Sequence, residues 1–209
     1  MSTKESSRGR IDNFKKHVMG LAVNPDFVHH QWFVEWHLKI VERLALELIE
    51  PYPAADRDLV EVMVWLHDYG KILDYEHQYD RHLLDAGRDT LLELGFDQAF
   101  ATKAADYIEL LDKKLTTDLR QAPIEVQIVS TADGCSHMTG PFLYTIWHEA
   151  TDTSFAGKTM AQLMHINRQK LDKDWQHKIV LPEARQAFEV RYRLLCEQAG
   201  DLPEHFLVT

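Results

Sequence analysis

Two adjacent side chains that can bind a metal ion follow an apolar stretch of this sequence. Residues 62–66 are all hydrophobic, and His67 and Asp68 come directly after them, with Gly70 close behind. An imidazole and a carboxylate at the buried end of a helix must be satisfied there, and a divalent metal ion satisfies both. The pair therefore predicts half of a metal site, and Gly70 predicts the end of the helix.

A third candidate ligand lies upstream on the apolar face of another predicted helix. The residues that recur there at steps of three and four are Val34, His37, Val41, Leu44 and Leu48. This spacing places them on one face of a helix, so His37 points toward the core with the valines and leucines. For a single histidine the alternative is a hydrogen-bonded core residue without a metal.

An aspartate has the same inward position in a helix predicted over 123–138. Ala122, Val126, Val129 and Asp133 follow one another by steps of four, three and four. A lone buried aspartate among apolar residues is costly to ionise unless a cation or a donor lies nearby. Three predicted helices thus each direct a metal-competent side chain toward a core.

Together these residues resemble the ligand pattern of the HD-domain superfamily of metal-dependent phosphohydrolases. That pattern is a histidine on one helix, a His-Asp pair that ends a later helix, and a distant aspartate. In this sequence its members are His37, His67, Asp68 and Asp133. The resemblance covers about residues 25–140, and it includes the form His-Asp-x-Gly-Lys that ends at Lys71. Each motif is degenerate, but their ordered combination is specific.

The resemblance implies an all-α fold and a metal-dependent reaction. We expect one HD-domain helical bundle over 1–209, with a metal-binding core at about 25–140 and extra C-terminal helices over 141–209. Family habit also suggests a homodimer.

The donor set itself indicates the chemistry. Two imidazoles and two carboxylates suit a divalent ion such as manganese, cobalt, nickel, iron, zinc or magnesium better than calcium. Water bound to such an ion has a lowered pKa and can attack a phosphoryl group. Asp68 and Asp133 are the candidates for accepting its proton. The leading hypothesis is hydrolysis of a phosphorylated small molecule, such as a nucleotide phosphomonoester or phosphodiester.

Two other functions stay open at this point. Relatives that hold two metals, which include iron oxygenases, carry further histidines between the His-Asp pair and the last aspartate. Here His77 and His82 follow the pair, but 83–132 contains no histidine, which favours one metal. The other alternative is a non-catalytic module that senses a nucleotide. A branch that cleaves deoxynucleoside 5′-monophosphates typically has a glutamate where Lys71 stands, so that substrate class is only one option.

Two further residues are candidates for binding the substrate. Lys71 could place its ammonium beside a phosphate, or it could be a solvated residue in a turn. His82 could lie at the mouth of the site, or it could be an ordinary surface histidine. His137, one turn beyond Asp133, is expected to be capped or solvated.

The composition limits the partners. The chain has 209 residues and a formal net charge of −10, with a pI near 5.6. This acidity argues against broad binding to a nucleic acid polymer or an anionic membrane. Two cysteines are too few for a disulfide scaffold, which favours a reducing, cytoplasmic location. The N-terminal segment lacks a signal peptide's apolar core, and no apolar run reaches the length of a membrane span.

The periodicity predicts helices and no sheet. The expected helices cover 11–20, 25–50, 56–69, 81–94, a segment capped by Asp97, 123–138, 158–175 and 182–198. A loop over the site is expected from Gly134 to Pro141. The large side chains beyond it could form a lid or pocket wall, or could simply pack between helices; they are Phe142, Tyr144, Trp147, Phe155, Met160, Met164 and Trp175.

Overall fold

Every regular element that the structure describes is a helix. The structure is a computed structural model that describes residues 7–140, 142 and 156–204. Its elements are α1 (Ser7–Ala22), η1 (Val34–Leu38), α2 (Lys39–Leu48), α3 (Arg57–Leu66), α4 (Tyr69–Leu73), α5 (Arg81–Glu93), α6 (Gln98–Asp112), η2 (Leu119–Gln121), α7 (Ile124–Ser136), α9 (Met160–Lys173), η3 (Asp174–Lys178) and α10 (Pro182–Gln198). No strand occurs in these ranges, so the all-α prediction is confirmed.

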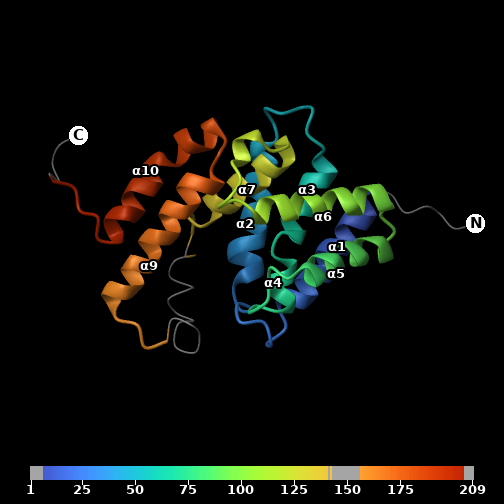
Figure 1. Cartoon of the computed structure of the whole chain (residues 1–209), viewed down its shortest axis with the longest axis horizontal. Coiled ribbons are helices and arrows are strands. Elements are labelled where there is room, and N and C mark those ends of the chain that lie inside the picture. Colours follow the sequence, from blue (N-terminus) through green and yellow to red (C-terminus); the bar gives the residue numbers. More distant parts are fainter. Residues whose placement is uncertain (1–6, 141, 143–155, 205–209) are drawn as a thin grey trace, which may run out of the picture.

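Helices α2, α3 and α7 form the centre of the bundle. Each of the three packs against the other two, α1 lies on α3, and α5 pairs with α6. Figure 1 shows α9 and α10 side by side at the end of the molecule away from α1 and α5. The apolar faces of the central helices meet through fully buried side chains such as Val41, Val62 and Val129. Removal of these faces from water is the main force that holds the helices together.

Capping side chains fix several helix starts where the sequence predicts them. The carboxylates of Asp56 and Asp97 accept hydrogen bonds from the backbone N–H groups of Leu59 and Phe100. Caps of this kind stabilise a helix by about 1 kcal/mol each. The last long helix begins with Pro182 in its first turn, as expected.

The helix predicted over 25–50 is shorter than expected. Residues 24–32 form turns, and the side chain of Asn24 accepts a hydrogen bond from the N–H of Asp26 instead of capping a helix. The helical segment then opens with η1, a π-helical turn that contains His37, before α2 continues it. His37 is only 1% exposed, in agreement with the predicted inward face.

The role predicted for Gly70 is wrong. Helix α3 ends at Leu66 with His67 as its C-cap, and Gly70 lies inside the next short helix, α4. A Cβ atom at Gly70 would lie 2.5 Å from the backbone oxygen of Gln78. Glycine is therefore needed because the following loop passes against α4, not because the helix ends there.

The loop expected from Gly134 is also wrong, since α7 continues to Ser136. A Cβ atom at Gly134 would lie 2.8 Å from Ile179 Cγ1 and 3.0 Å from Lys178 Cβ. The missing side chain thus lets η3 pack directly on α7.

The large side chains expected to form a lid or a pocket wall have different outcomes. Tyr144, Trp147 and Phe155 lie outside the described residues. Trp175 stacks on Tyr192 of α10, with ring centroids 4.5 Å apart, which agrees with plain helix packing. No helix in the described part of the chain combines the length and the apolar character needed to span a bilayer.

Candidate functional site

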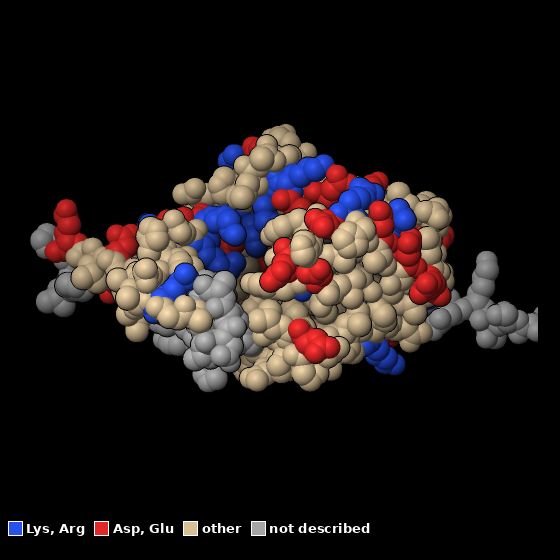
Figure 2. All heavy atoms as spheres, turned by 60° about the horizontal axis from the view of Figure 1, so that its bottom comes forward, with Lys and Arg blue, Asp and Glu red and all other residues tan. Residues whose placement is uncertain are grey.

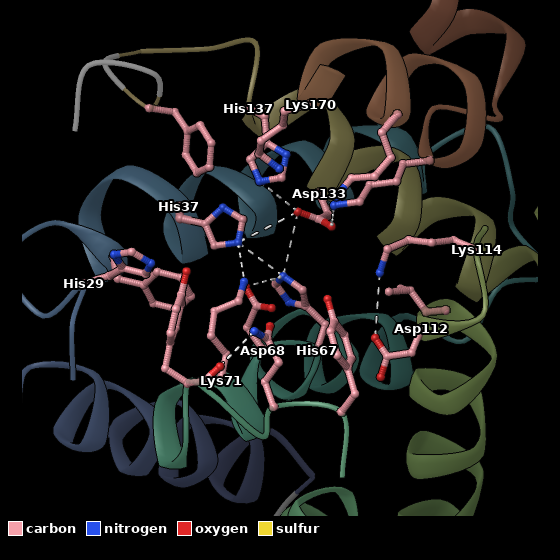
Figure 3. Close-up of a pocket in the computed structure, with 18 of the residues that line it drawn as sticks. His29, His37, His67, Asp68, Lys71, Asp112, Lys114, Asp133, His137 and Lys170 are labelled. Carbon is pink, nitrogen blue, oxygen red and sulfur yellow. Dashed lines mark hydrogen bonds and ion pairs between the residues drawn. The ribbon is translucent and has the colours of Figure 1, made fainter. Parts of the chain in front are cut away.

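The structure brings the four predicted metal ligands together from distant parts of the chain. His37 comes from η1, His67 and Asp68 from the junction of α3 and α4, and Asp133 from α7. His37 Nε2 lies 3.3 Å from His67 Nε2, 3.1 Å from Asp68 Oδ2 and 3.9 Å from Asp133 Oδ1. His67 Nε2 lies 3.4 Å and 4.0 Å from the same two carboxylate oxygens. Figure 3 shows the side chains converging on one point.

Hydrogen bonds on the far side of each imidazole fix its orientation. His67 Nδ1 lies 2.7 Å from the carbonyl oxygen of Val64, which can only accept, so Nδ1 carries the proton. The Ser136 hydroxyl donates to the carbonyl of Asp133, and its oxygen therefore accepts from His37 Nδ1 at 3.2 Å. In a neutral imidazole with Nδ1 protonated, Nε2 carries a lone pair. Both lone pairs then face the centre of the site.

This arrangement of acceptors fits a cation. Donor atoms held about 2.1 Å from one ion lie between about 3.0 Å apart at right angles and about 4.2 Å apart on opposite sides. The separations of the His37, His67 and Asp133 atoms fall inside this range, and these three atoms form a mutually close group that could hold a metal. Asp68 Oδ2 approaches both histidines but lies outside that group.

The protonation states of the histidines agree with a cation site. Burial lowers the pKa of His37 to about 4, against the attraction of Asp68 and Asp133, so this imidazole is neutral at pH 7. Burial acts to lower the pKa of His67, but Asp68, Asp133 and the Val64 carbonyl together raise it above its ordinary value. A metal ligand must be the neutral imidazole, so metal binding would favour the neutral form of His67.

Each carboxylate of the site is also held by a lysine. Lys71 Nζ lies 2.7 Å from Asp68 Oδ2, and Lys178 Nζ donates to Asp133 Oδ2 at 2.6 Å. Burial alone would raise the pKa of both aspartates, but these ammonium groups and the nearby histidines hold it well below its ordinary value. Both carboxylates are therefore ionised at neutral pH.

His137 belongs to this site, contrary to the expectation of a capped or solvated residue. Its side chain is buried, and Nδ1 donates to Asp174 Oδ2 at 2.8 Å. Nε2 therefore directs a lone pair toward Asp133 Oδ1, 3.3 Å away. Its position four residues after Asp133 was the sequence feature that could have indicated this, because residues one turn apart share a helix face.

The four candidate metal ligands line a cavity of about 250 Å³. Lys71 lines this cavity. His82 does not: its side chain is 70% exposed, and its closest charged neighbour is Asp80 at 4.0 Å. The structure therefore gives no support to His82 as a substrate group.

Lysines and aromatic side chains line the cavity together: Lys71 Nζ lies 5.7 Å from the ring centroid of Phe33, and Lys170 Nζ lies 5.5 Å from that of Phe142. The lysines that line it are Lys71, Lys114, Lys170, Lys173 and Lys178. Sequence reasoning missed four of them, because they come from the end of α6 and from the C-terminal helices. The aromatic residues that line the cavity include Trp32, Phe33 and Phe142. The ring centroids of Phe142 and His137 lie 4.1 Å apart. Figure 2 shows Lys and Arg side chains gathered around a hollow beside the C-terminal helices.

Comparison of this chain with protein-family models, curated proteins and solved structures gave no match. The resemblance to the HD-domain superfamily therefore depends on the ligand pattern itself, now with the geometry of its members.

Proposed function

We propose that the protein is a metal-dependent hydrolase of a phosphorylated small molecule, as the HD-domain resemblance suggests. The observation that carries this proposal is the convergence of His37 Nε2, His67 Nε2 and Asp133 Oδ1 on one point in a lysine-lined cavity. A cluster of electron-pair donors such as this favours binding of a cation, and the ammonium groups beside it favour binding of an anion. Phosphate ester hydrolysis uses both.

His37, His67 and Asp133 would hold the ion, with Asp68 as the fourth ligand. When bound, a divalent ion lowers the pKa of water and polarises a phosphoryl oxygen. Lys71 lies beside Asp68 and is placed to offset negative charge that develops on the phosphoryl oxygens during in-line attack. The ionised carboxylates of Asp68 and Asp133 are the groups that can take a proton from the attacking water.

The cavity suits a small substrate. Its volume of about 250 Å³ lies just below the usual range of ligand pockets, which begins at about 300 Å³. A nucleotide would place its phosphate at the ion and its base against the aromatic side chains. Both cysteines are free and buried, which fits a cytoplasmic protein. A homodimer stays a prediction from the resemblance alone.

Phosphate release from a panel of nucleotides and sugar phosphates, with manganese or cobalt added, tests this proposal. The wild type should release phosphate, whereas His67→Ala and Asp68→Ala should lose both turnover and bound metal, measured by elemental analysis. His82→Ala is the matched control, because this histidine lies outside the cavity. Full activity in His67→Ala would contradict the assignment.

The same experiment separates the two alternatives. Oxygen uptake with two ions per chain would indicate an iron oxygenase. Tight nucleotide binding without phosphate release would indicate a sensing module.

A further inference from the structure

The lysines of the cavity form two groups that differ in their partners. Lys71 and Lys178 are held at short distance by Asp68 and Asp133, the carboxylates of the metal site. The other three lysines form no ion pair with Asp68 or Asp133 in the described part of the chain; they are Lys114, Lys170 and Lys173.

The second group is poorly neutralised within the protein. The only carboxylate that pairs with Lys114 in the described residues is that of Asp112, at 3.8 Å. Lys170 lies 3.4 Å from Asp174, but that carboxylate is shared with His137 and Lys178. Lys173 makes no ion pair with any residue that the structure describes.

The electrostatics of the cavity point the same way. Burial, together with the charges of Lys178 and Lys173, lowers the pKa of Lys170 to about 8 against the pull of Asp174. Burial and the charge of Lys178 also lower the pKa of Lys114. Limited access to water is the main cause of both shifts, and repulsion from the Lys178 ammonium contributes to each of them. An anion bound between the ammonium groups would remove that repulsion.

A charge count indicates how much negative charge the cavity can bind. Five lysines line the cavity together with three carboxylates, those of Asp68, Asp112 and Asp133. Lys114, Lys170 and Lys173 bring three positive charges, against Asp112 and an Asp174 carboxylate that is shared with His137 and Lys178. One phosphate monoester carries about two negative charges near pH 7. A single phosphate at the ion would therefore leave the lysines only partly neutralised.

We propose that the substrate carries a second phosphate group and that Lys114, Lys170 and Lys173 bind it. This inference rests on the proposed function and narrows its substrate class to small molecules with at least two phosphates. The metal site binds the phosphate that is cleaved. The three lysines, two of which belong to α9, bind the second phosphate and thereby orient the molecule.

Calorimetric titration of the metal-free full chain with inorganic orthophosphate and pyrophosphate tests the second subsite without turnover. The chain is first stripped with a chelator and then dialysed free of it, because a chelator is itself a polyanion. The wild type should bind pyrophosphate at least about tenfold more tightly than orthophosphate, as expected for added charge-assisted hydrogen bonds. The double variant Lys114→Gln/Lys173→Gln should lose this preference.

Lys103→Gln is the control, since Lys103 is an exposed lysine of α6, the helix that precedes Lys114. It should keep the wild-type preference. If the double variant does not fold, Lys173→Gln alone serves, because no native ion pair is lost there. Equal affinity for the two anions, or an undiminished preference in the variant, would overturn the proposal.

The outcome is separable from that of the catalytic test. Lysine-dependent pyrophosphate binding by a chain that hydrolyses nothing would support the subsite and remove the proposed function. Hydrolysis of monophosphates without any pyrophosphate preference would remove the subsite alone. With an active substrate, the same variant should raise KM for bisphosphorylated compounds while kcat stays constant.

Discussion

Replacing Asp133 with asparagine tests two roles of this carboxylate, one in the fold and one in the metal site. Asp133→Asn keeps the volume of the side chain and removes its charge. Asp133 is 4% exposed, and Lys178, its 2.6 Å partner, is 5% exposed. Lys178 has one other carboxylate, that of Asp174 at 3.3 Å. The substitution therefore leaves a buried ammonium with one carboxylate instead of two.

The cost of this change can be bounded. Removal of one partner from a buried ion pair destabilises a protein by about 3–5 kcal/mol. Asp174 still faces Lys178 in the variant, and the asparagine oxygen can accept one hydrogen bond, so we expect the lower end, about 3 kcal/mol. For a chain of 209 residues this corresponds to a fall of about 6–12 °C in melting temperature.

Urea denaturation of the metal-free proteins at pH 7, followed by circular dichroism, measures the change. Asp89→Asn is the control, because Asp89 pairs with Arg88 on the surface and its loss should change stability by less than about 0.5 kcal/mol. Repeating the measurement with manganese tests the second role, since only the wild type and the control should gain stability. An Asp133→Asn variant as stable as the wild type would refute the buried pair. A full response to manganese in that variant would refute the ligand assignment.

Three other predictions address the metal, pH and the lysines. For an ion bound with a Kd of about 1 µM, 1 mM manganese should stabilise the wild type by about 4 kcal/mol, and thermal melts of His67→Ala should lose most of this gain. In the metal-free chain the lowered pKa values of His37, about 4, and His137, about 3, mean that both imidazoles are neutral when folded but protonate in the unfolded chain below pH 6.5. Their contribution to the unfolding free energy is thus complete above pH 6.5 and decreases below it, by up to about 1.4 kcal/mol per pH unit for each histidine. Urea titrations from pH 6.5 to 4.5 should show a smaller decrease of the unfolding free energy with falling pH in His137→Gln than in the wild type. The same decrease in both proteins would contradict the assignment. The unfolding free energy of Lys173→Gln should be no more than about 0.5 kcal/mol below that of the wild type. A much larger loss of stability would indicate that Lys173 has a structural role.

The positions of the four candidate ligands were predictable because they depend on local features of the sequence. His37 and Asp133 occur at helical spacing with valines, so burial of the apolar face carries them inward. His67 and Asp68 follow a stretch that is buried in full, and the break after α3 separates the directions of their side chains. The meeting of these groups then follows from the packing of α2, α3 and α7 around one core.

The cationic wall of the cavity was not predictable from the same features. Lysine normally faces water. Nothing in the spacing of Lys170, Lys173 and Lys178 distinguishes them from lysines on a solvated helix face. Their direction depends on how η3 packs against α7. That packing requires the absence of a side chain at position 134. From the sequence, Gly134 was interpreted as the start of a loop, although it lies inside α7.

His82 illustrates the opposite error. A histidine soon after the His-Asp pair suggested a group at the site mouth, but it lies in the first turn of α5 with its side chain in solvent. Proximity in sequence gave the wrong expectation because the intervening loop lines the cavity through Tyr75, Gln78 and Tyr79, whereas the His82 side chain points into solvent. Lys114 reaches the cavity from the turn that follows α6.

The metal site and the lysines are expected to depend on each other through the two carboxylates that they share. In the metal-free chain Asp68 holds Lys71 and Asp133 holds Lys178, so these ammonium groups are partly neutralised by the protein itself. A divalent ion between the same carboxylates competes for that negative charge and leaves the lysines more exposed to an incoming anion. By linkage, an anion that draws the lysines away makes the carboxylates better ligands by the same factor. Cation and anion should therefore each bind more tightly in the presence of the other, which is the behaviour that a site for phosphate ester hydrolysis requires.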